Sequence, residues 1–459
     1  MKDMTLFKIA HACKGTLVDN REEHKENPEV QGVVIDSRLV QPGYLFVATK
    51  GERVDGHSFI PQVIEQGAVG IICEQIPNRN DIPYILVKDS LIALQEIAEY
   101  YRSTLSIPFI GITGSVGKTS TKEFIAGVLA RRYHVLKTQG NYNNEVGVPL
   151  TILQIREEHE VAVLEMGINH FGEMHRLSKM VRPDICVMTN IGQCHLEFLG
   201  SREGILSAKS EIFDYMRDTG TVCVNGDDDM LQTIDAIHGK SPISYGLSPA
   251  NQIYAGDIED RGLHGSLCKL HLKEGIIDVK IPLMGRHMIY NALAAAAVGQ
   301  LLGLSLQEIA EGIASVEALS GRNHVITTDH YTVIDDCYNA NPISMQAAID
   351  TLVTAPGRTV AILGDMGELG DDVERLHTQV GAYCAAKGVD LLLCVGDLSQ
   401  YIAQGAAEQS KTHTTTIVSY LDKECLMQAL PIQLQRGDTI LVKASHFMRF
   451  ETIIQALCS

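Results

Sequence analysis

The segment GITGSVGKTSTKEF, residues 111–124, decides the fold class of this chain. It follows the apolar run SIPFI and continues into a helical stretch that ends in IAGVLA. A strand, a glycine loop and a helix in this order present backbone N–H groups at a helix N-terminus, where they bind phosphate. Gly114 and Gly117 allow the tight turn, Lys118 supplies a positive charge, and Thr119 offers a hydroxyl to magnesium. The segment therefore predicts a nucleotide-binding loop.

The spacing of this loop differs from the general P-loop pattern. That pattern has a glycine five positions before the second glycine, and Ile112 occupies that position here, which leaves the compact form TGSVGKT. A glycine turn that merely precedes a helix is the competing interpretation, and the order of strand, loop and helix disfavours it. The residues expected to contact the nucleotide are Gly114, Ser115, Val116, Gly117, Lys118, Thr119 and Ser120.

Length and composition restrict the class of protein. A chain of 459 residues is long enough for about three domains, and no apolar run reaches the roughly 18 residues that span a bilayer. The N-terminus lacks the features of a signal peptide, and the eleven cysteines form no CxxC pair, so we expect a cytoplasmic protein with reduced thiols. The net charge of −18 argues against nonspecific nucleic-acid binding. We expect a monomer that binds small molecules and neither nucleic acid nor a membrane.

The order of apolar runs and helical patterns predicts an α/β fold with three domains. Residues 1–105 alternate short apolar runs with turn signals, as in a small α/β domain. In residues 106–317, strand-like runs recur between helical patterns, and an Ala-rich helical segment, 281–316, closes this central domain. That alternation is typical of a mostly parallel sheet with ligands at the carboxyl ends of its strands. Residues 318–459 repeat it, which predicts a C-terminal Rossmann-like domain.

Two further polar residues follow strands of the predicted central sheet. Glu165 ends the apolar run VAVLE, and His195 comes after the run ICVMTN. At these positions a carboxylate and an imidazole would meet a magnesium ion held at the loop. Each has a structural explanation when taken alone, since Glu165 could cap the next helix and His195 could be an ordinary loop residue. Their joint placement favours a metal site.

Other candidate residues have structural explanations of equal or greater weight. On helical spacing alone, Lys209 is a solvated lysine that pairs with Glu203 or Glu211. Asn143 and Asn144 suit hydrogen bonds to phosphate or backbone, and a turn held by asparagine side chains explains them as well.

In the third domain, Asp336 ends an apolar strand and Arg322 precedes the first strand. An acid at a strand end can hold a ribose hydroxyl, and an arginine near a domain junction can reach a nucleotide. Surface salt bridges are the competing explanation for both residues.

Taken together, these stretches resemble the Mur ligases, ATP-dependent enzymes that form the amide bonds of the bacterial peptidoglycan peptide. The matching blocks run from DSR, residues 36–38, to KASHFM, residues 443–448, and cover nearly the whole chain. The most specific blocks are GNYNNEVGVPLTIL, YNANPISM and LGDMGELG, the last at residues 363–370. Within the family, they are similar to the members that add D-alanyl-D-alanine to a UDP-N-acetylmuramoyl tripeptide. The resemblance implies ATP and Mg²⁺ as cofactors and an acyl phosphate as intermediate.

The resemblance also implies roles for individual residues. The first domain would grip the UDP end of the substrate through Ser37 and Arg38, the second would bind ATP, and the third would bind the incoming amine and close over the nucleotide. The implied roles are as follows: nucleotide contacts at Asn291, Arg322 and Asp336; substrate contacts at Asn143, Asn144, Asn339 and Asn341; magnesium ligands at Thr119, Glu165, His195 and Lys209; and catalytic residues at Lys118, His195 and Lys209. Lys209 would act as a carbamate, which is an anionic ligand for a second magnesium ion.

Two departures from the family pattern leave alternatives open. Met288 stands where the family usually has an asparagine in the block GRHMIYNALAA, and Ala444 and His446 replace the usual glycine and arginine in KASHFM. A catalytically weak nucleotide-binding paralogue is therefore one alternative. A folylpolyglutamate synthase or a different Mur ligase is another. A P-loop GTPase is disfavoured because the chain has no NKxD segment.

Overall fold

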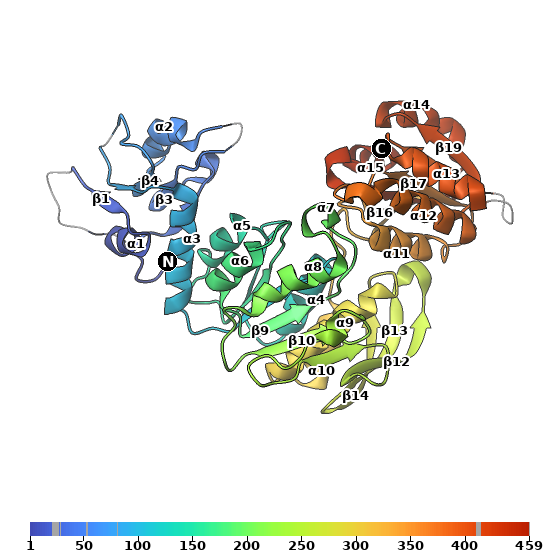
Figure 1. The fold of residues 1–459 in the computed structure, drawn as a ribbon, viewed down its shortest axis with the longest axis horizontal. Helices are drawn as coiled ribbons and strands as arrows, with labels where there is room; N and C mark the ends of the chain where they lie inside the picture. The colour runs from blue at the N-terminus through green and yellow to red at the C-terminus, as the bar shows by residue number, and fades with distance from the viewer. Residues whose placement is uncertain (21–26, 28, 52–53, 80, 410–414, 459) are drawn as a thin grey trace. The chain divides into compact units, whose positions relative to one another are not determined.

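The computed structural model describes residues 1–20, 27, 29–51, 54–79, 81–409 and 415–458. The strands of these residues belong to three sheets of five, nine and six strands, and Figure 1 shows the helices that connect them. The chain divides into two compact units: Met1–Thr113, Tyr133–Val187 and Lys209–Val222 form the first, and Gly114–Arg132, Met188–Ala208 and Cys223–Ser459 form the second. The predicted α/β class is confirmed. In the described ranges, no helix combines the length and apolar character needed to cross a bilayer.

The first unit begins with a small sheet whose strand order is β1-β5-β4-β3-β2. Strand β1 runs antiparallel to β5, and the other neighbours are parallel. Phe46 and Ile71 of this sheet pack against Val63 of α2 in a buried cluster. The elements are α1 (Leu6–Ala12), β1 (Thr16–Val18), β2 (Gly32–Val34), η1 (Ser37–Leu39), β3 (Tyr44–Val47), η2 (Gly56–Phe59), α2 (Ile60–Glu65), β4 (Gly70–Cys73) and β5 (Tyr84–Leu86).

The remainder of the first unit starts with a long helix, α3 (Ser90–Thr104). The Asp89 carboxylate caps its N-terminus by accepting from the Ile92 amide, and Leu94, Ile97 and Tyr101 form its buried face at helical spacing. Strands β6 and β7 each pair in parallel with β8. The elements are β6 (Phe109–Thr113), β7 (Val135–Lys137), α5 (Gly147–Ile152), β8 (Val161–Glu165), α6 (Glu173–Val181), β9 (Ile185–Met188) and η3 (Glu211–Phe213).

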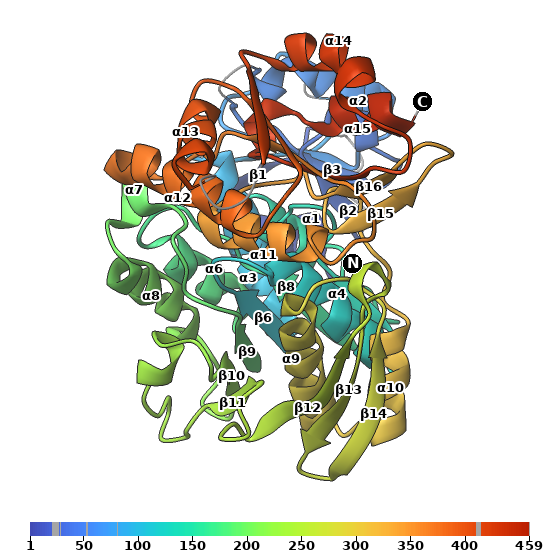
Figure 2. The same ribbon diagram turned by 90° about the vertical axis from the view of Figure 1, so that its right-hand side faces the viewer.

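The second unit contains the helix that follows the glycine loop, α4 (Lys118–Leu129). Strands β10, β11 and β12 are parallel, whereas β13 and β14 form antiparallel pairs, which the sequence did not predict. Helices α9 and α10 pack beside these strands (Figure 2). The elements are α7 (Leu196–Leu199), α8 (Arg202–Ser210), β10 (Thr221–Asn225), η4 (Leu231–Thr233), β11 (Ile243–Gly246), β12 (Ile253–Asp260), η5 (Gly262–His264), β13 (Ser266–Leu272), β14 (Gly275–Ile281), α9 (His287–Leu301) and α10 (Leu306–Ala314).

Two helices occupy the Ala-rich segment that closes the predicted central domain. Gly303 adopts φ +77° just after α9, a conformation that ends a helix. Ser305 then caps α10 in a capping box with Glu308. The helical character of the segment is confirmed, and its interruption follows from these local signals.

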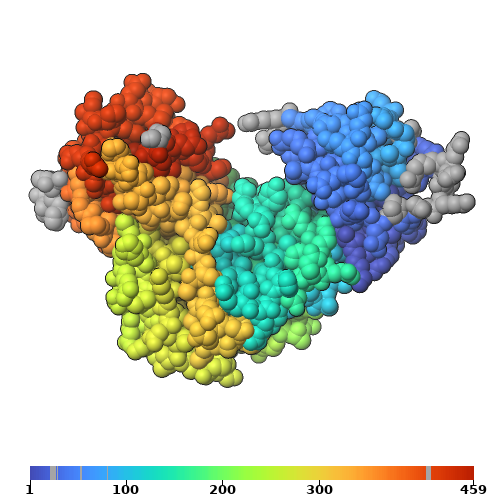
Figure 3. Space-filling model, turned by 180° about the vertical axis from the view of Figure 1, so that it is seen from behind, coloured from blue at the N-terminus to red at the C-terminus, as the bar shows by residue number. Residues whose placement is uncertain are grey.

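The last part of the second unit is a six-stranded sheet with the order β15-β16-β20-β17-β18-β19. Only β15 is antiparallel to its neighbour among these described strands. In Figure 3 the atoms of these residues are coloured orange to red. The elements are β15 (His324–Thr327), β16 (Thr332–Asp335), α11 (Pro342–Leu352), β17 (Thr359–Gly364), η6 (Gly370–Asp372), α12 (Val373–Ala386), β18 (Leu391–Val395), α13 (Ser399–Gln409), β19 (Thr416–Tyr420), α14 (Lys423–Gln433), β20 (Thr439–Lys443), η7 (His446–Met448) and α15 (Glu451–Cys458).

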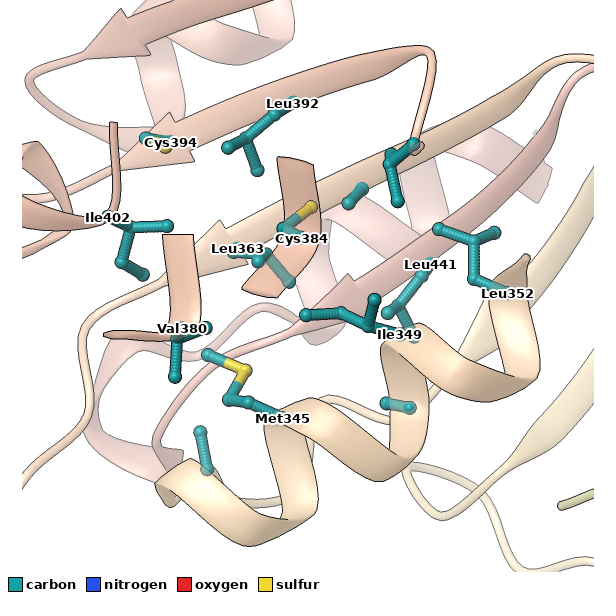
Figure 4. Close-up of a cluster of buried hydrophobic side chains, with 14 of the residues drawn as sticks. Met345, Ile349, Leu352, Leu363, Val380, Cys384, Leu392, Cys394, Ile402 and Leu441 are labelled. Atoms are coloured by element: carbon teal, nitrogen blue, oxygen red, sulfur yellow. The ribbon is translucent and has the colours of Figure 1, made fainter. Parts of the chain in front are cut away.

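Both faces of the central strands β17, β18 and β20 are buried, as their continuous apolar runs predict. Ala361 and Leu363 of β17 belong to one core cluster, which includes Met345 of α11 and Val380 of α12 (Figure 4). The alternate residues of β17 belong to a second cluster with α14 and α15. Successive side chains of a strand point to opposite faces, so helices cover this sheet on two sides. The expected Rossmann-like architecture is confirmed.

Candidate active site

The glycine loop turns directly into α4, as the sequence predicts. Gly114 has φ +149°, and Gly117 has φ +81° and caps the helix. A Cβ atom on Gly114 would lie 2.0 Å from Thr189 Oγ1, so no side chain fits there. The first intrahelical bond runs from the Thr121 amide to the Gly117 carbonyl. The preceding amides of the first turn have no intrahelical acceptor and are the natural donors to an anion.

Thr189 and Asn190, which follow β9, hold the loop in place. The Ser115 amide donates to the Asn190 carbonyl at 2.9 Å, and the Val116 amide donates to Asn190 Oδ1 at 3.0 Å. Thr189 Oγ1 donates to the Val116 carbonyl at 2.6 Å. The amides of Ser115 and Val116 are thus engaged within the protein, which leaves the first-turn amides of α4 to meet phosphate. Sequence reasoning did not identify this pair of residues, although both stand at the end of a predicted strand.

Lys118 lies across the loop. Its Nζ atom donates to the Gly114 carbonyl at 2.8 Å and to the Ser115 carbonyl at 3.4 Å. The positive charge is therefore held above the turn that precedes the helix N-terminus. Thr119 and Ser120 follow in the first turn of α4.

Asn291 of α9 lies beside the N-terminus of α4, where a Cβ atom on Gly117 would be 3.3 Å from Asn291 Oδ1. Its Oδ1 atom accepts from Thr121 Oγ1 at 2.9 Å, and its Nδ2 atom donates to Met288 Sδ at 3.2 Å. Both Asn291 and Met288 are buried. Met288 therefore contacts Asn291 within the core. The structure gives the Met288 side chain this role without any contact to adenine.

A buried polar cluster lies at the carboxyl end of β16. Lys443 Nζ donates to Asp336 Oδ2 at 2.5 Å, and the Asn323 amide donates to Asp336 Oδ1 at 3.2 Å. Asn323 Nδ2 lies 2.9 Å from Nε2 of His287, so this ring nitrogen accepts. Burial lowers the pKa of His287, against the opposing effect of Asp336. Lys443 and His287 were not among the predicted site residues.

The other predicted residues of this region surround the cluster. The Arg322 guanidinium lies 3.9 Å from the centre of the Tyr338 ring, in a cation–π contact. The Asn339 carbonyl accepts from Lys443 Nζ at 3.0 Å. Asn341 caps α11 in a reciprocal capping box with Ser344. The Asn341 side chain therefore has a structural task, whatever else it contacts.

Ala444 and His446, which replace the usual glycine and arginine in KASHFM, differ in their exposure to solvent. Ala444 is fully buried. A Cβ atom on Gly364 would lie 2.8 Å from the Cβ atom of Ala444. His446 is exposed, with its ring 5.4 Å from that of Tyr338 and its Nδ1 atom 3.8 Å from Glu451.

His195 contacts a residue that sequence reasoning did not single out. Its Nδ1 atom lies 2.5 Å from Oε2 of Glu368, in the block LGDMGELG. His195 has φ +55° and Glu368 has φ +60°. Since the two residues are 173 positions apart, no local spacing could have revealed this contact.

In the first unit, Glu165 ends β8 and is buried. Its Oε1 atom accepts from Asn143 Nδ2 at 2.8 Å, and its amide donates to Thr138 Oγ1 at 3.0 Å. Asn144 Oδ1 accepts from the Val146 and Gly147 amides at the start of α5. Asn143 thus orients the predicted metal ligand, and the turn explanation holds for Asn144.

The remaining predicted residues of the first unit differ in exposure. Lys209, in the last turn of α8, is fully buried, so the solvated lysine expected from helical spacing is wrong. Ser37 is buried in η1, whereas Arg38 is exposed and forms an ion pair with Asp36. Hydrogen bonds from Arg38 lower the pKa of Asp36 to about 2.

The residues present fit a nucleotide and magnesium by their chemistry. The loop leaves no room for a side chain at Gly114, and the first turn of α4 presents amides and the Thr119 hydroxyl. The carboxylate of Glu165 is a hard ligand of the kind that magnesium prefers. Within the described residues, no group of three or more His, Cys, Asp or Glu side chains is arranged to hold a metal ion. A magnesium ion that takes other ligands from phosphate and water requires fewer side chains than that.

Comparison with known proteins places three family models on the chain. Residues 29–105 match the Mur ligase family catalytic domain, residues 112–299 the Mur ligase middle domain, and residues 321–446 the Mur ligase glutamate ligase domain. The UDP-N-acetylmuramoyl-tripeptide–D-alanyl-D-alanine ligase of Bacillus subtilis is 38% identical over 99% of this chain and 98% of its own length. The structure of MurF from Acinetobacter baumannii is 32% identical with a TM-score of 0.89 over 99% of this chain and 98% of its own. MurF ligase from Thermotoga maritima, solved in complex with ADP, is 29% identical with a TM-score of 0.81 over 93% of this chain and 97% of its own.

Proposed function

Because the chain belongs to the Mur ligase family, we propose that it is an ATP-dependent ligase that joins D-alanyl-D-alanine to a UDP-N-acetylmuramoyl tripeptide during peptidoglycan precursor synthesis. The observation that carries this assignment is the 38% identity, over nearly full length, to a ligase with that name. The glycine loop at the start of α4 supports it, since the reaction needs a bound triphosphate.

The reaction proceeds in two steps. The free carboxylate of the tripeptide attacks the γ-phosphorus of ATP, which gives an acyl phosphate and releases ADP. The amine of D-alanyl-D-alanine then attacks the acyl carbon and loses a proton, and inorganic phosphate leaves as the amide bond forms. Water must be excluded between the steps, because it would hydrolyse the acyl phosphate.

Residues around the loop hold the phosphates. The first-turn amides of α4 and Lys118 neutralise charge on the transferring phosphoryl group, which is the main contribution of a protein to this chemistry. Magnesium supplies further positive charge when it is bound by Thr119, Glu165 and His195, with Lys209 as a carbamate ligand of a second ion. The burial of Lys209 and the hydrogen bond from Asn143 to Glu165 support these two assignments.

The rest of the nucleotide meets Asn291, Arg322 and Asp336 in this proposal. The uridine end of the substrate meets Ser37 and Arg38. The remaining substrate contacts are Asn143, Asn144, Asn339 and Asn341. The three domains are residues 1–105, 106–317 and 318–459, and each of the three sheets lies inside one of these ranges.

A single incubation tests the function. The protein is mixed with ATP, Mg²⁺, a UDP-N-acetylmuramoyl tripeptide and D-alanyl-D-alanine, and the product is identified by mass. We expect the UDP-linked pentapeptide together with ADP and phosphate, and no product when single D-alanine or glutamate replaces the dipeptide. Amide formation with a single amino acid would identify a different amide ligase. ADP binding without any amide product would identify a catalytically weak paralogue.

A further inference from the structure

The contact between His195 and Glu368 assigns a task to a residue outside the predicted site. We propose that Glu368, in the loop between β17 and η6, is a positioning residue for the metal ligand His195. This inference rests on the proposed function, because it takes His195 as a ligand of the magnesium that ATP brings. Glu368 contacts neither ATP nor the reacting atoms in this proposal and acts through the imidazole.

The chemistry of the two side chains determines the tautomer of His195. Oε2 of Glu368 lies 2.5 Å from Nδ1 of His195, and an ionised carboxylate can only accept a hydrogen bond. Nδ1 therefore carries a proton, and in the neutral ring that binds a metal the lone pair is on Nε2. Metal-binding histidines characteristically donate their other ring nitrogen to a carboxylate, which sets the tautomer and the ring orientation.

The backbone on both sides of the contact adopts an uncommon conformation. His195 has φ +55° and Glu368 has φ +60°, in the left-handed region that side chains other than glycine rarely enter. Such a conformation persists only where the surroundings enforce it, and it is concentrated at functional sites. Here two such residues meet in one hydrogen bond.

The loop that carries Glu368 is held by the six-stranded sheet region. The Met366 amide donates to Nε2 of His377 at 2.9 Å, and Nδ1 of His377 donates to the Val373 carbonyl at 2.7 Å. The Gly367 amide donates to Ser445 Oγ at 2.9 Å. The two residues before Glu368 are thus fixed by buried partners, so the carboxylate is presented from a rigid base.

The contact joins residues from two family domains. His195 lies in the stretch that matches the middle domain, and Glu368 lies in the stretch that matches the glutamate ligase domain. If Glu368 orients the imidazole for a metal, then bound metal must also favour the docking of residues 364–370, since coupling between two sites is reciprocal. The affinity of the site for metal would therefore depend on whether the Glu368 loop is docked against His195.

The test measures metal affinity directly. Mn²⁺, a paramagnetic substitute for Mg²⁺, is titrated into the full-length protein saturated with ADP and followed by electron paramagnetic resonance. We expect Glu368→Ala to weaken Mn²⁺ binding about tenfold to hundredfold, the usual effect of losing a residue that orients a ligand. Glu368→Gln should have a smaller effect, because its amide oxygen still accepts from Nδ1. Glu197→Gln is the matched control, since Glu197 is an exposed carboxylate two residues from His195 and should change the affinity less than about twofold.

A second measurement separates positioning from loss of charge. In ¹⁵N-histidine spectra, the His195 signal is the one that is absent in His195→Ala. It should show a protonated Nδ1 in the wild type and a mixture of tautomers in Glu368→Ala. Unchanged Mn²⁺ affinity and unchanged tautomer in both Glu368 variants would overturn the inference while the pentapeptide assay still succeeded. An effect of Glu197→Gln as large as that of Glu368→Ala would also overturn it. Failure of the pentapeptide assay itself would reject the proposed function.

Discussion

Nζ of Lys443 lies 2.5 Å from Oδ2 of Asp336, and both residues are buried at the carboxyl ends of adjacent parallel strands. Replacing Lys443 with methionine would leave the Asp336 carboxylate buried without this cation. We expect this change to lower the free energy of unfolding by about 3–5 kcal/mol. Hydrogen exchange of the β16 and β20 amides measures the loss locally. Lys387→Met, which breaks an exposed ion pair with Asp350, should cost about 1 kcal/mol or less, and equal effects would contradict the distinction.

His377 should make the stability of the protein depend on pH. Its Nε2 atom accepts from the Met366 amide, so protonation would place two donors against each other. Burial lowers the pKa of His377 in the folded state below its ordinary value of 6.5, and the unfolded chain therefore binds the proton first. The stabilising contribution is complete above about pH 6.5 and is lost as the pH falls from there toward the folded pKa.

The measurement is the free energy of unfolding of the wild type and of His377→Gln between pH 8 and pH 5. The difference between them should shrink as the pH falls. Burial raises the pKa of Asp365, which acts in the opposite direction, and the interaction of this carboxyl with His377 is part of the measured difference. A difference that stays constant over this range would contradict the assignment.

Gly114→Ala should damage the loop by collision as well as by backbone strain. Its φ of +149° disfavours a side chain, and the new Cβ would lie 2.0 Å from Thr189 Oγ1. We expect ADP binding to be lost, as measured by calorimetry, and the thermal midpoint to fall. Gly388→Ala is the control, because Gly388 also has positive φ and its Cβ would meet open space, so only about 1–3 kcal/mol of strain is expected there.

Lys118→Ala should reduce turnover with little effect on folding. Its ammonium lies over the loop carbonyls, where its fixed positive charge would face the triphosphate in place of water. We expect kcat to fall about 10²–10³-fold, the typical loss when one such electrostatic contact is removed. Steady-state kinetics provide the measurement, with the exposed Lys280→Ala as control. Unchanged turnover in Lys118→Ala would remove this lysine from the mechanism.

Lys209→Ala should be inactive and should recover in part when short carboxylic acids are added. A free carboxylate can occupy the cavity left by the buried side chain and replace the carbamate as a magnesium ligand. Pentapeptide synthesis is measured with and without added acetate or propionate. Lys118→Ala should not respond to these acids. Full activity of Lys209→Ala without them would refute the carbamate role.

The strands that the sequence predicted most clearly are those buried on both faces. Runs such as TVAILG at 359–364 are continuously apolar and separate clearly from helices. Strand β13, SLCKLHL, was missed because only alternate residues are buried and polar ones intervene. The edge strand β19 is exposed at Thr416 and Ser419 and carries a similarly weak signal.

In the candidate site, too, some residues could be predicted from local sequence and others could not. Local order was enough to predict the loop and its helix, because the donors are consecutive residues. The roles of Asn190, Glu368 and Lys443 depend on contacts between residues 74 to 173 positions apart in the chain. Lys209 shows the limit most clearly, since helical spacing predicts a solvated side chain and only the folded core makes it buried.

The bonds from Thr189 and Asn190 to the glycine loop have a consequence for how a nucleotide enters. A loop that must order itself around its ligand loses conformational entropy at the moment of binding. This loop is already ordered when the protein folds, so nucleotide binding does not carry that entropic cost. Preorganisation of this kind lets the enzyme exchange ADP for ATP without refolding the turn that grips them.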